Sequence, residues 1–127
     1  MNILVGTDGR SAAEVATDYS FRLTKALGAT MYIIYVVDKN SKDDKEKRIK
    51  TGMRILGRLK IKAAENDVEV TTLLEAGRPQ ETLVEAAERI GADMIVIGSS
   101  EPGKGKSKKS LQNIIKSKAN CTVVVVR

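Results

Sequence analysis

The sequence predicts an α/β fold in which a parallel sheet is covered by helices on both faces. Five short apolar segments alternate with four segments of helical periodicity, which is the pattern of strands joined by helical crossovers. Right-handed crossovers of this kind give a doubly wound sheet. The chain has 127 residues, the usual length of one domain, so we expect a single domain over residues 1–127.

The first predicted strand and helix lie within residues 2–28. The apolar run at 3–5 stops at the turn residues Thr7-Asp8-Gly9, which is typical of a buried strand. Ser11 is predicted to cap the following helix and Gly28 to end it. Helical spacing predicts that the sheet-facing side chains are those of Ala12, Val15, Ala16, Tyr19, Leu23, Ala26 and Leu27.

The middle of the chain adds two strands and one helix. Residues 30–37 are rich in β-branched and aromatic side chains and predict a strand covered on both faces. A polar loop leads into a helix that runs to about Asn66, in which Gly52 and Gly57 each cost up to about 1 kcal/mol relative to alanine. Residues 68–75 admit polar side chains, which suits a strand at the edge of the sheet.

The last part of the chain predicts a helix, a strand, a second helix and a final strand. The turn Gly77-Arg78-Pro79 opens a helix that Gly91 closes. Residues 94–97 are a fully apolar strand, a helix covers roughly 110–119, and the run CTVVVV at 121–126 supplies the final strand.

Composition excludes several classes of function. The sequence has no histidine and one cysteine, Cys121, which disfavours Ser-His-Asp or Cys-His catalysis, a transition-metal site and a disulfide framework. We expect a soluble, cytoplasmic protein, because residues 1–9 do not resemble a secretory signal and no apolar run approaches the ~20 residues of a membrane span. The net charge of +6 favours anionic partners, although solvated surface lysines are the simpler explanation.

The carboxyl ends of the strands are the predicted ligand-binding edge. Ligands of doubly wound sheets bind there, where the strand order reverses, and those ends are Asp8, Val36 to Asp38, and Gly98 onward. The run at 98–104 matches the phosphate-loop pattern GxxxxGK, but Gly105 stands where Ser or Thr would hold Mg²⁺. We therefore do not predict a nucleotidase.

The loop that follows Gly98 still predicts anion binding. Its glycines let backbone N–H groups approach a phosphate, and four lysines between residues 104 and 109 add positive charge. The alternative is a solvated lysine loop without a ligand. The role of Asp8 also has two interpretations. A carboxylate at a strand end either accepts hydrogen bonds from a ribose or base, or serves as a turn or helix-cap residue.

Three blocks of the sequence together resemble the universal stress protein family. They are ILVGTDGRSAAEVATDYSFRLTKALGATMYIIYVVD at 3–38, GRPQETLVEAAERIGADMIVIGSS at 77–100 and SLQNIIKSKANCTVVVVR at 110–127. One block alone is compatible with an unrelated flavodoxin-like protein, whereas their order and spacing are specific to the family. The resemblance covers nearly the whole chain.

The resemblance implies a flavodoxin- or Rossmann-like sheet of order 3-2-1-4-5 and a homodimer through the last strand, Cys121 to Val126. Many members bind ATP, and others do not. The cofactor that the resemblance implies here is ATP, with or without Mg²⁺. In those members the aspartate of the first strand contacts the nucleotide, a valine ending the second strand lies near adenine, and the loop after the fourth strand holds phosphates and ribose. The candidate nucleotide-binding residues are accordingly Gly6, Thr7, Asp8, Val36, Ile97, Gly98, Ser99, Gly103, Lys104, Gly105, Lys106, Lys109 and Ser110.

The loop after the fourth strand departs from the family pattern. Glu101 replaces the second glycine, Lys109 replaces the third, and the loop is two residues short. A carboxylate at 101 repels phosphates, whereas the lysines and the displaced Gly103 and Gly105 compensate electrostatically. The sequence leaves open whether ATP still binds.

We expect a cytoplasmic stress-response sensor or adaptor that binds ATP weakly or in a variant pose. It is not expected to be an enzyme, and any ATP hydrolysis should be slow and incidental. The alternative is a family member that binds no nucleotide and works through contacts with an unknown protein partner. Nucleic-acid binding is disfavoured because aromatic residues for stacking are scarce, and no membrane partner is expected.

Overall fold

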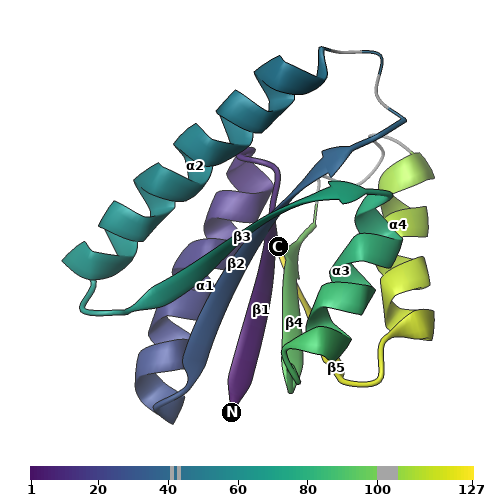
Figure 1. Ribbon diagram of the computed structural model, residues 1–127. Helices are drawn as coiled ribbons and strands as arrows, with labels where there is room; N and C mark the ends of the chain where they lie inside the picture. The colour runs from purple at the N-terminus through teal and green to yellow at the C-terminus, as the bar shows by residue number, and fades with distance from the viewer. Residues whose placement is uncertain (41, 43, 100–105) are drawn as a thin grey trace.

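Strands and helices alternate along the whole chain (Figure 1). The computed structural model describes residues 1–40, 42, 44–99 and 106–127, without the side chains of 106–111. The strands are β1 (Asn2–Thr7), β2 (Thr30–Asp38), β3 (Val70–Gly77), β4 (Met94–Gly98) and β5 (Thr122–Val126). The helices are α1 (Ser11–Leu27), α2 (Lys45–Glu65), α3 (Pro79–Arg89) and α4 (Lys106–Lys118).

The five strands form one parallel sheet in the order β3-β2-β1-β4-β5. This confirms the predicted doubly wound sheet and its strand order. β1 is central, since Ile3 pairs with Met31 of β2 on one side and with Met94 of β4 on the other. The strand order therefore reverses between β1 and β4, and the carboxyl ends of these two strands flank the switch point.

Two layers of apolar side chains fill the space between the sheet and its helices. α1 and α2 cover one face, where Phe21, Ile33 and Leu59 are buried together (Figure 1). α3 and α4 cover the other face, where Ile34 and Leu83 are buried. Adjacent residues of β2 thus point to opposite faces and both are buried, which explains why the strand has no polar alternation in its sequence.

The buried face of α1 differs from the predicted one. The helix buries Ala13, Ala16, Thr17, Ser20, Phe21 and Thr24. Val15, Ala26 and Leu27 are exposed, Val15 to 47% and Leu27 to 49%, so their assignment to the sheet-facing side is wrong. The hydroxyls of Thr17 and Ser20 each donate to the carbonyl oxygen four residues earlier, at 2.8 Å. Because these small polar groups are satisfied within the helix, they can face the sheet.

The helix ends have identifiable causes. Ser11 is the first residue of α1 and not its cap, because the N-cap position belongs to Arg10, whose side chain makes no capping bond. Gly28 ends α1 as predicted, in the left-handed conformation with φ of 61°. α2 begins where Asp44 accepts a hydrogen bond from the backbone N–H of Glu46 at 3.0 Å.

Candidate functional site

A cavity of about 410 Å³ lies at the carboxyl edge of the sheet. The ends of β1, β2 and β4 line it, together with residues near the starts of α1, α2 and α3 and residues of α4. Its described lining residues are Gly6, Thr7, Asp8, Arg10, Ala12, Ala13, Ile34, Tyr35, Val36, Asp38, Arg48, Pro79, Leu83, Ile97, Gly98, Gln112 and Ile115. This volume is in the range of small-molecule sites, and its position is the usual ligand position of a doubly wound sheet.

The cavity brings together predicted site residues that are far apart in the sequence. Those that line it are Gly6, Thr7, Asp8, Val36, Ile97 and Gly98. They meet because the carboxyl ends of neighbouring parallel strands share one edge of the sheet. Ser99 is not among the lining residues, and its backbone N–H donates to the carbonyl oxygen of Val126 at 2.8 Å.

The predicted lysine-rich loop is only partly described. Gly103, Lys104 and Gly105 lie outside the described residues. Lys106, Lys109 and Ser110 belong to the first turns of α4, which begins at Lys106, so the predicted helix start at Ser110 is wrong. Lysine is a good helix former, and the lysine run therefore extends the helix. The side chains of these three residues are outside the description, so their part in ligand binding stays a prediction.

Asp8 lies at the cavity as a turn residue. Its Oδ1 accepts a hydrogen bond from the backbone N–H of Arg10 at 2.9 Å, which leads the chain from β1 into α1. Thr7 Oγ1 supports the same turn by accepting a bond from the backbone N–H of Gly9 at 3.1 Å. The turn holds the exposed carboxylate of Asp8 at the cavity, with one oxygen engaged by the backbone and the other 3.8 Å from Arg10 Nε.

Other charged side chains at the cavity escaped the sequence analysis. Arg10 lies two residues after Asp8, Asp38 is predicted only as a strand end, and Arg48 lies near the start of α2. Asp38 repeats the geometry of Asp8, because its Oδ1 accepts a hydrogen bond from the backbone N–H of Asn40 at 2.9 Å. A charged residue at the end of a buried strand, or in the turn that follows it, is the sequence signal for Asp38 and Arg10. No sequence pattern around Arg48 indicates a site.

The arrangement suits a ligand with an apolar ring and polar groups of both signs. Val36 and Ile97 offer apolar surface to a ring. Carboxylates such as Asp8 accept hydrogen bonds from hydroxyl or amino groups, and guanidinium groups such as Arg48 bind anionic oxygens. Among the described residues, no three His, Cys, Asp or Glu side chains cluster as metal ligands would.

Cys121 lies at the opposite edge of the sheet, just before β5. Burial raises the pKa of its thiol above the ordinary value, and the negative charge of Asp93 raises it further. Little thiolate is therefore present at neutral pH, and the thiol is a poor nucleophile.

In the part of the chain that the structure describes, no helix is long and apolar enough to cross a membrane.

Comparisons with known proteins agree on one family. The model of the universal stress protein family matches residues 1–127. A universal stress protein of Methanocaldococcus jannaschii is 31% identical over 140 residues, which cover 98% of this chain and 81% of the relative.

Solved structures share the fold. Universal stress protein UspA from Lactobacillus plantarum has a TM-score of 0.88 at 20% identity, covering 100% of this chain and 97% of the other. The universal stress protein from Archaeoglobus fulgidus in complex with dAMP has a TM-score of 0.76 at 20% identity, covering 100% and 98%. At this identity the two structures establish the fold.

Proposed function

Because the chain belongs to the universal stress protein family, we propose that its cavity binds an adenine nucleotide and that the protein is a stress-response sensor or adaptor. One observation carries the proposal: Asp8, Val36 and Gly98, for which the family resemblance implies nucleotide contacts, line one cavity. The relative from Archaeoglobus fulgidus, solved with dAMP, supports an adenine nucleotide as the ligand class.

The described side chains suit the parts of such a ligand. Val36 and Ile97 provide apolar surface for the base, and the second oxygen of Asp8 can accept a hydrogen bond from a ribose hydroxyl. Arg10 and Arg48 provide guanidinium groups for phosphate oxygens. The ligand we propose first is ATP, with or without Mg²⁺.

Titration of the nucleotide-free protein with ATP and with AMP, by calorimetry with and without Mg²⁺, tests this function. We expect micromolar affinity that falls about 10- to 100-fold in an Asp8→Asn variant, since a hydrogen bond to a charged group contributes about 1.5–3 kcal/mol. Asparagine keeps Oδ1 as the acceptor for the Arg10 N–H and so preserves the turn. It replaces the second oxygen with an amide donor.

Glu85→Gln is the matched control, because it makes the same chemical change at an exposed carboxylate of α3. We expect it to bind like the wild-type protein. No heat with either nucleotide at millimolar concentration would contradict the proposed function and leave protein contacts as the better account. Undiminished affinity of Asp8→Asn would contradict the role of Asp8 alone.

We propose no chemical step at this site. The sequence contains no histidine, the commonest general base. Hydrolysis of bound ATP is therefore expected to be slow and incidental to signalling.

We also propose that two chains pair through β5. In the described sheet β5 has β4 on one side only, and its four valines are half-buried. An uncovered apolar edge strand favours pairing with a second chain. Val125→Lys introduces a charge into that interface and is expected to give a monomer by light scattering, whereas Thr71→Lys, on the opposite edge strand β3, stays dimeric. A monomeric wild-type protein at micromolar concentration contradicts the pairing.

A further inference from the structure

Helix α2 has a formal charge equal to that of the whole chain. It contains eight basic and two acidic side chains, so its charge of +6 matches the net charge of all 127 residues. Arg58 and Lys62 pair with Glu14 and Asp18 of α1 at 2.6 and 2.8 Å. Lys50, Arg54 and Lys60 are among the exposed cations of α2 that form no ion pair with the described residues.

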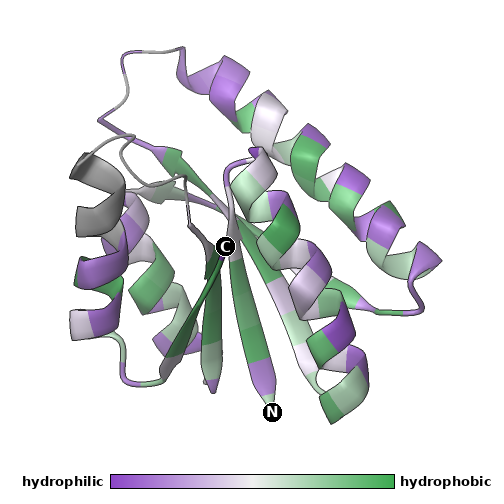
Figure 2. Cartoon of the chain, turned by 180° about the vertical axis from the view of Figure 1, so that it is seen from behind, coloured by the Kyte–Doolittle hydropathy of each residue, from purple (hydrophilic) through white to green (hydrophobic). Residues whose placement is uncertain are grey.

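The same helix exposes two large apolar side chains. Met53 and Ile61 are 62% and 65% exposed, the highest values among the large hydrophobic residues that the structure describes. At 1.5 Å per residue they lie about 12 Å apart along the helix axis. Gly57 lies between them, and a Cβ built there meets no atom within 4 Å. Figure 2 shows hydrophobic and hydrophilic residues interleaved along α2.

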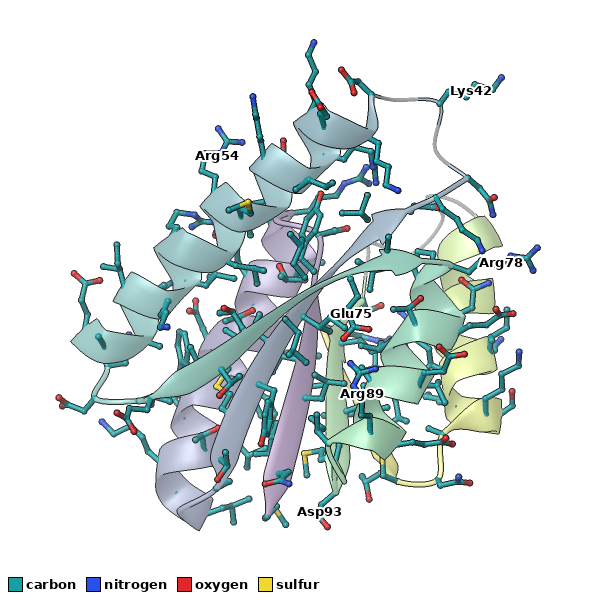
Figure 3. The ribbon with its side chains drawn as sticks, viewed as in Figure 1. Lys42, Arg54, Glu75, Arg78, Arg89 and Asp93 are labelled. Atoms are coloured by element: carbon teal, nitrogen blue, oxygen red, sulfur yellow. The ribbon has the colours of Figure 1, made fainter. Side chains whose placement is uncertain are left out.

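This outer face of α2 consists of Lys50, Met53, Arg54, Gly57, Lys60 and Ile61. The fold does not use it, because the residues that α2 buries against the sheet are others, among them Leu56 and Leu59. Figure 3 shows Arg54 projecting away from the sheet. No described element covers the face, so its apolar side chains and its cations are available to a partner.

We propose that the outer face of α2 is a docking surface for an acidic, amphipathic protein segment. Carboxylates of the segment would lie against Lys50, Arg54 and Lys60, and two of its apolar side chains would cover Met53 and Ile61. Charge complementarity selects an acidic partner, and methionine adapts its shape to different binding surfaces. The open space at Gly57 leaves room for a partner side chain between the two apolar anchors.

The mixed character of this face favours a protein over the two other polyanionic partners. A nucleic-acid backbone would use the cations but gain nothing from Met53 and Ile61, and α2 contains no aromatic residue on which a base could stack. A bilayer surface takes up a broad apolar helix face. The broad apolar face of α2 is buried against the sheet.

The probe is a synthetic helical peptide that carries two leucines at the spacing of Met53 and Ile61, with glutamates around them. It is titrated into the ¹⁵N-labelled full chain and followed by two-dimensional NMR. We expect saturable shift changes at the amides of α2 between Lys50 and Ile61. α4 is an internal control, because it contains five lysines and no acidic residue. Shift changes of equal size there mean unspecific charge attraction and overturn the proposal.

Two double variants separate the contributions to binding. Met53→Ser with Ile61→Ser removes the apolar anchors, and Lys50→Glu with Arg54→Glu reverses the charge. Each is expected to weaken peptide binding about tenfold or more. Because all four side chains are exposed, the variants should fold normally, and thermal unfolding checks this.

Matched controls come from α1. Val15→Ser with Leu27→Ser removes two exposed apolar side chains, and Arg22→Glu with Lys25→Glu makes the same change in net charge. Both controls are expected to bind the peptide as the wild-type protein does. An equal loss of affinity in the controls overturns the proposal, because it shows that position on α2 does not matter.

Two further results would contradict an acidic protein segment as the partner of the outer face of α2. Absence of peptide binding by the wild-type chain at millimolar concentration overturns the proposal. Binding to vesicles of phosphatidylglycerol and phosphatidylcholine in equal parts, or to a DNA oligonucleotide, in place of the peptide would assign the face to that partner instead. The proposal does not rest on nucleotide binding, and the peptide titration is done without nucleotide.

Discussion

The Gly98→Ala variant is expected to have a free energy of unfolding about 3 kcal/mol or more below that of the wild-type protein. A Cβ at this position would lie 2.2 Å from the carbonyl oxygen of Ala12 and 2.9 Å from the backbone nitrogen of Ala13. Both are backbone atoms of α1, so no side-chain rotation relieves the clash and the helix must move away from β4. A melting temperature about 10 °C lower, measured by circular dichroism, is the expected readout.

Gly6→Ala is the control for this prediction. Gly6 also lines the cavity, but the nearest atoms to a Cβ there are side-chain atoms, those of Leu83 at 3.4 Å and of Ile97 at 3.9 Å. We expect a change of less than about 1 kcal/mol. Wild-type stability of Gly98→Ala would show that α1 and β4 are not this close.

The close approach at Gly98 gives this glycine a role in packing that does not depend on a nucleotide. The resemblance associates this glycine with nucleotide binding. The geometry requires glycine at this position for packing, whether or not a nucleotide is present. A glycine at position 98 is therefore no evidence of nucleotide binding on its own. Nucleotide binding is tested by the titration of the wild-type protein and the Asp8→Asn variant.

Two glycines of α2 are expected to respond to alanine in opposite directions. Gly52→Ala should lower the free energy of unfolding by about 2 kcal/mol, because a Cβ there would lie 2.6 Å from Tyr35 Cδ1 and 2.8 Å from Leu74 Cδ1. Gly57→Ala should raise it by about 0.5–1 kcal/mol, because its Cβ meets no atom within 4 Å and alanine is the better helix former. Urea denaturation measures both.

Each of these variants is the control of the other, since both add one methyl group to the same helix. Stabilisation by Gly52→Ala would mean that α2 does not lie so close to Tyr35. Helix propensity alone assigns Gly52 and Gly57 the same free-energy cost relative to alanine. Their difference arises from packing between α2 and the sheet, which is why the sequence could not reveal it.

Except for β3, whose segment admits polar side chains, the strands could be predicted because each contains a continuous apolar run. The family resemblance supplied their order. The orientation of α1 could not be predicted in this way. Its buried side includes Thr17 and Ser20, which count as polar by composition but hydrogen-bond to their own helix. The start of β3 was also placed too early, because Val68 is buried before the strand begins at Val70.

The site was predictable where a strand end contributes a residue. Asp8, Val36 and Gly98 each follow or end an apolar run, so the topology alone brings them to one edge. Arg48 reaches the cavity from a helix whose start depends on the cap at Asp44. This local hydrogen bond sets where α2 begins and therefore where Arg48 lies, and the spacing of apolar residues in the sequence does not reveal it.

The central position of β1 has a consequence for synthesis on the ribosome. Ile3 pairs with Met94, and at about 5–20 residues per second a ribosome needs roughly 5 to 20 s to travel from one to the other. Within that interval β1 can pair with β2, but its other edge has no partner. The strand at the centre of the finished sheet is thus an open edge in the nascent chain. This sequence is exposed to unwanted strand pairing at its core while it is being made.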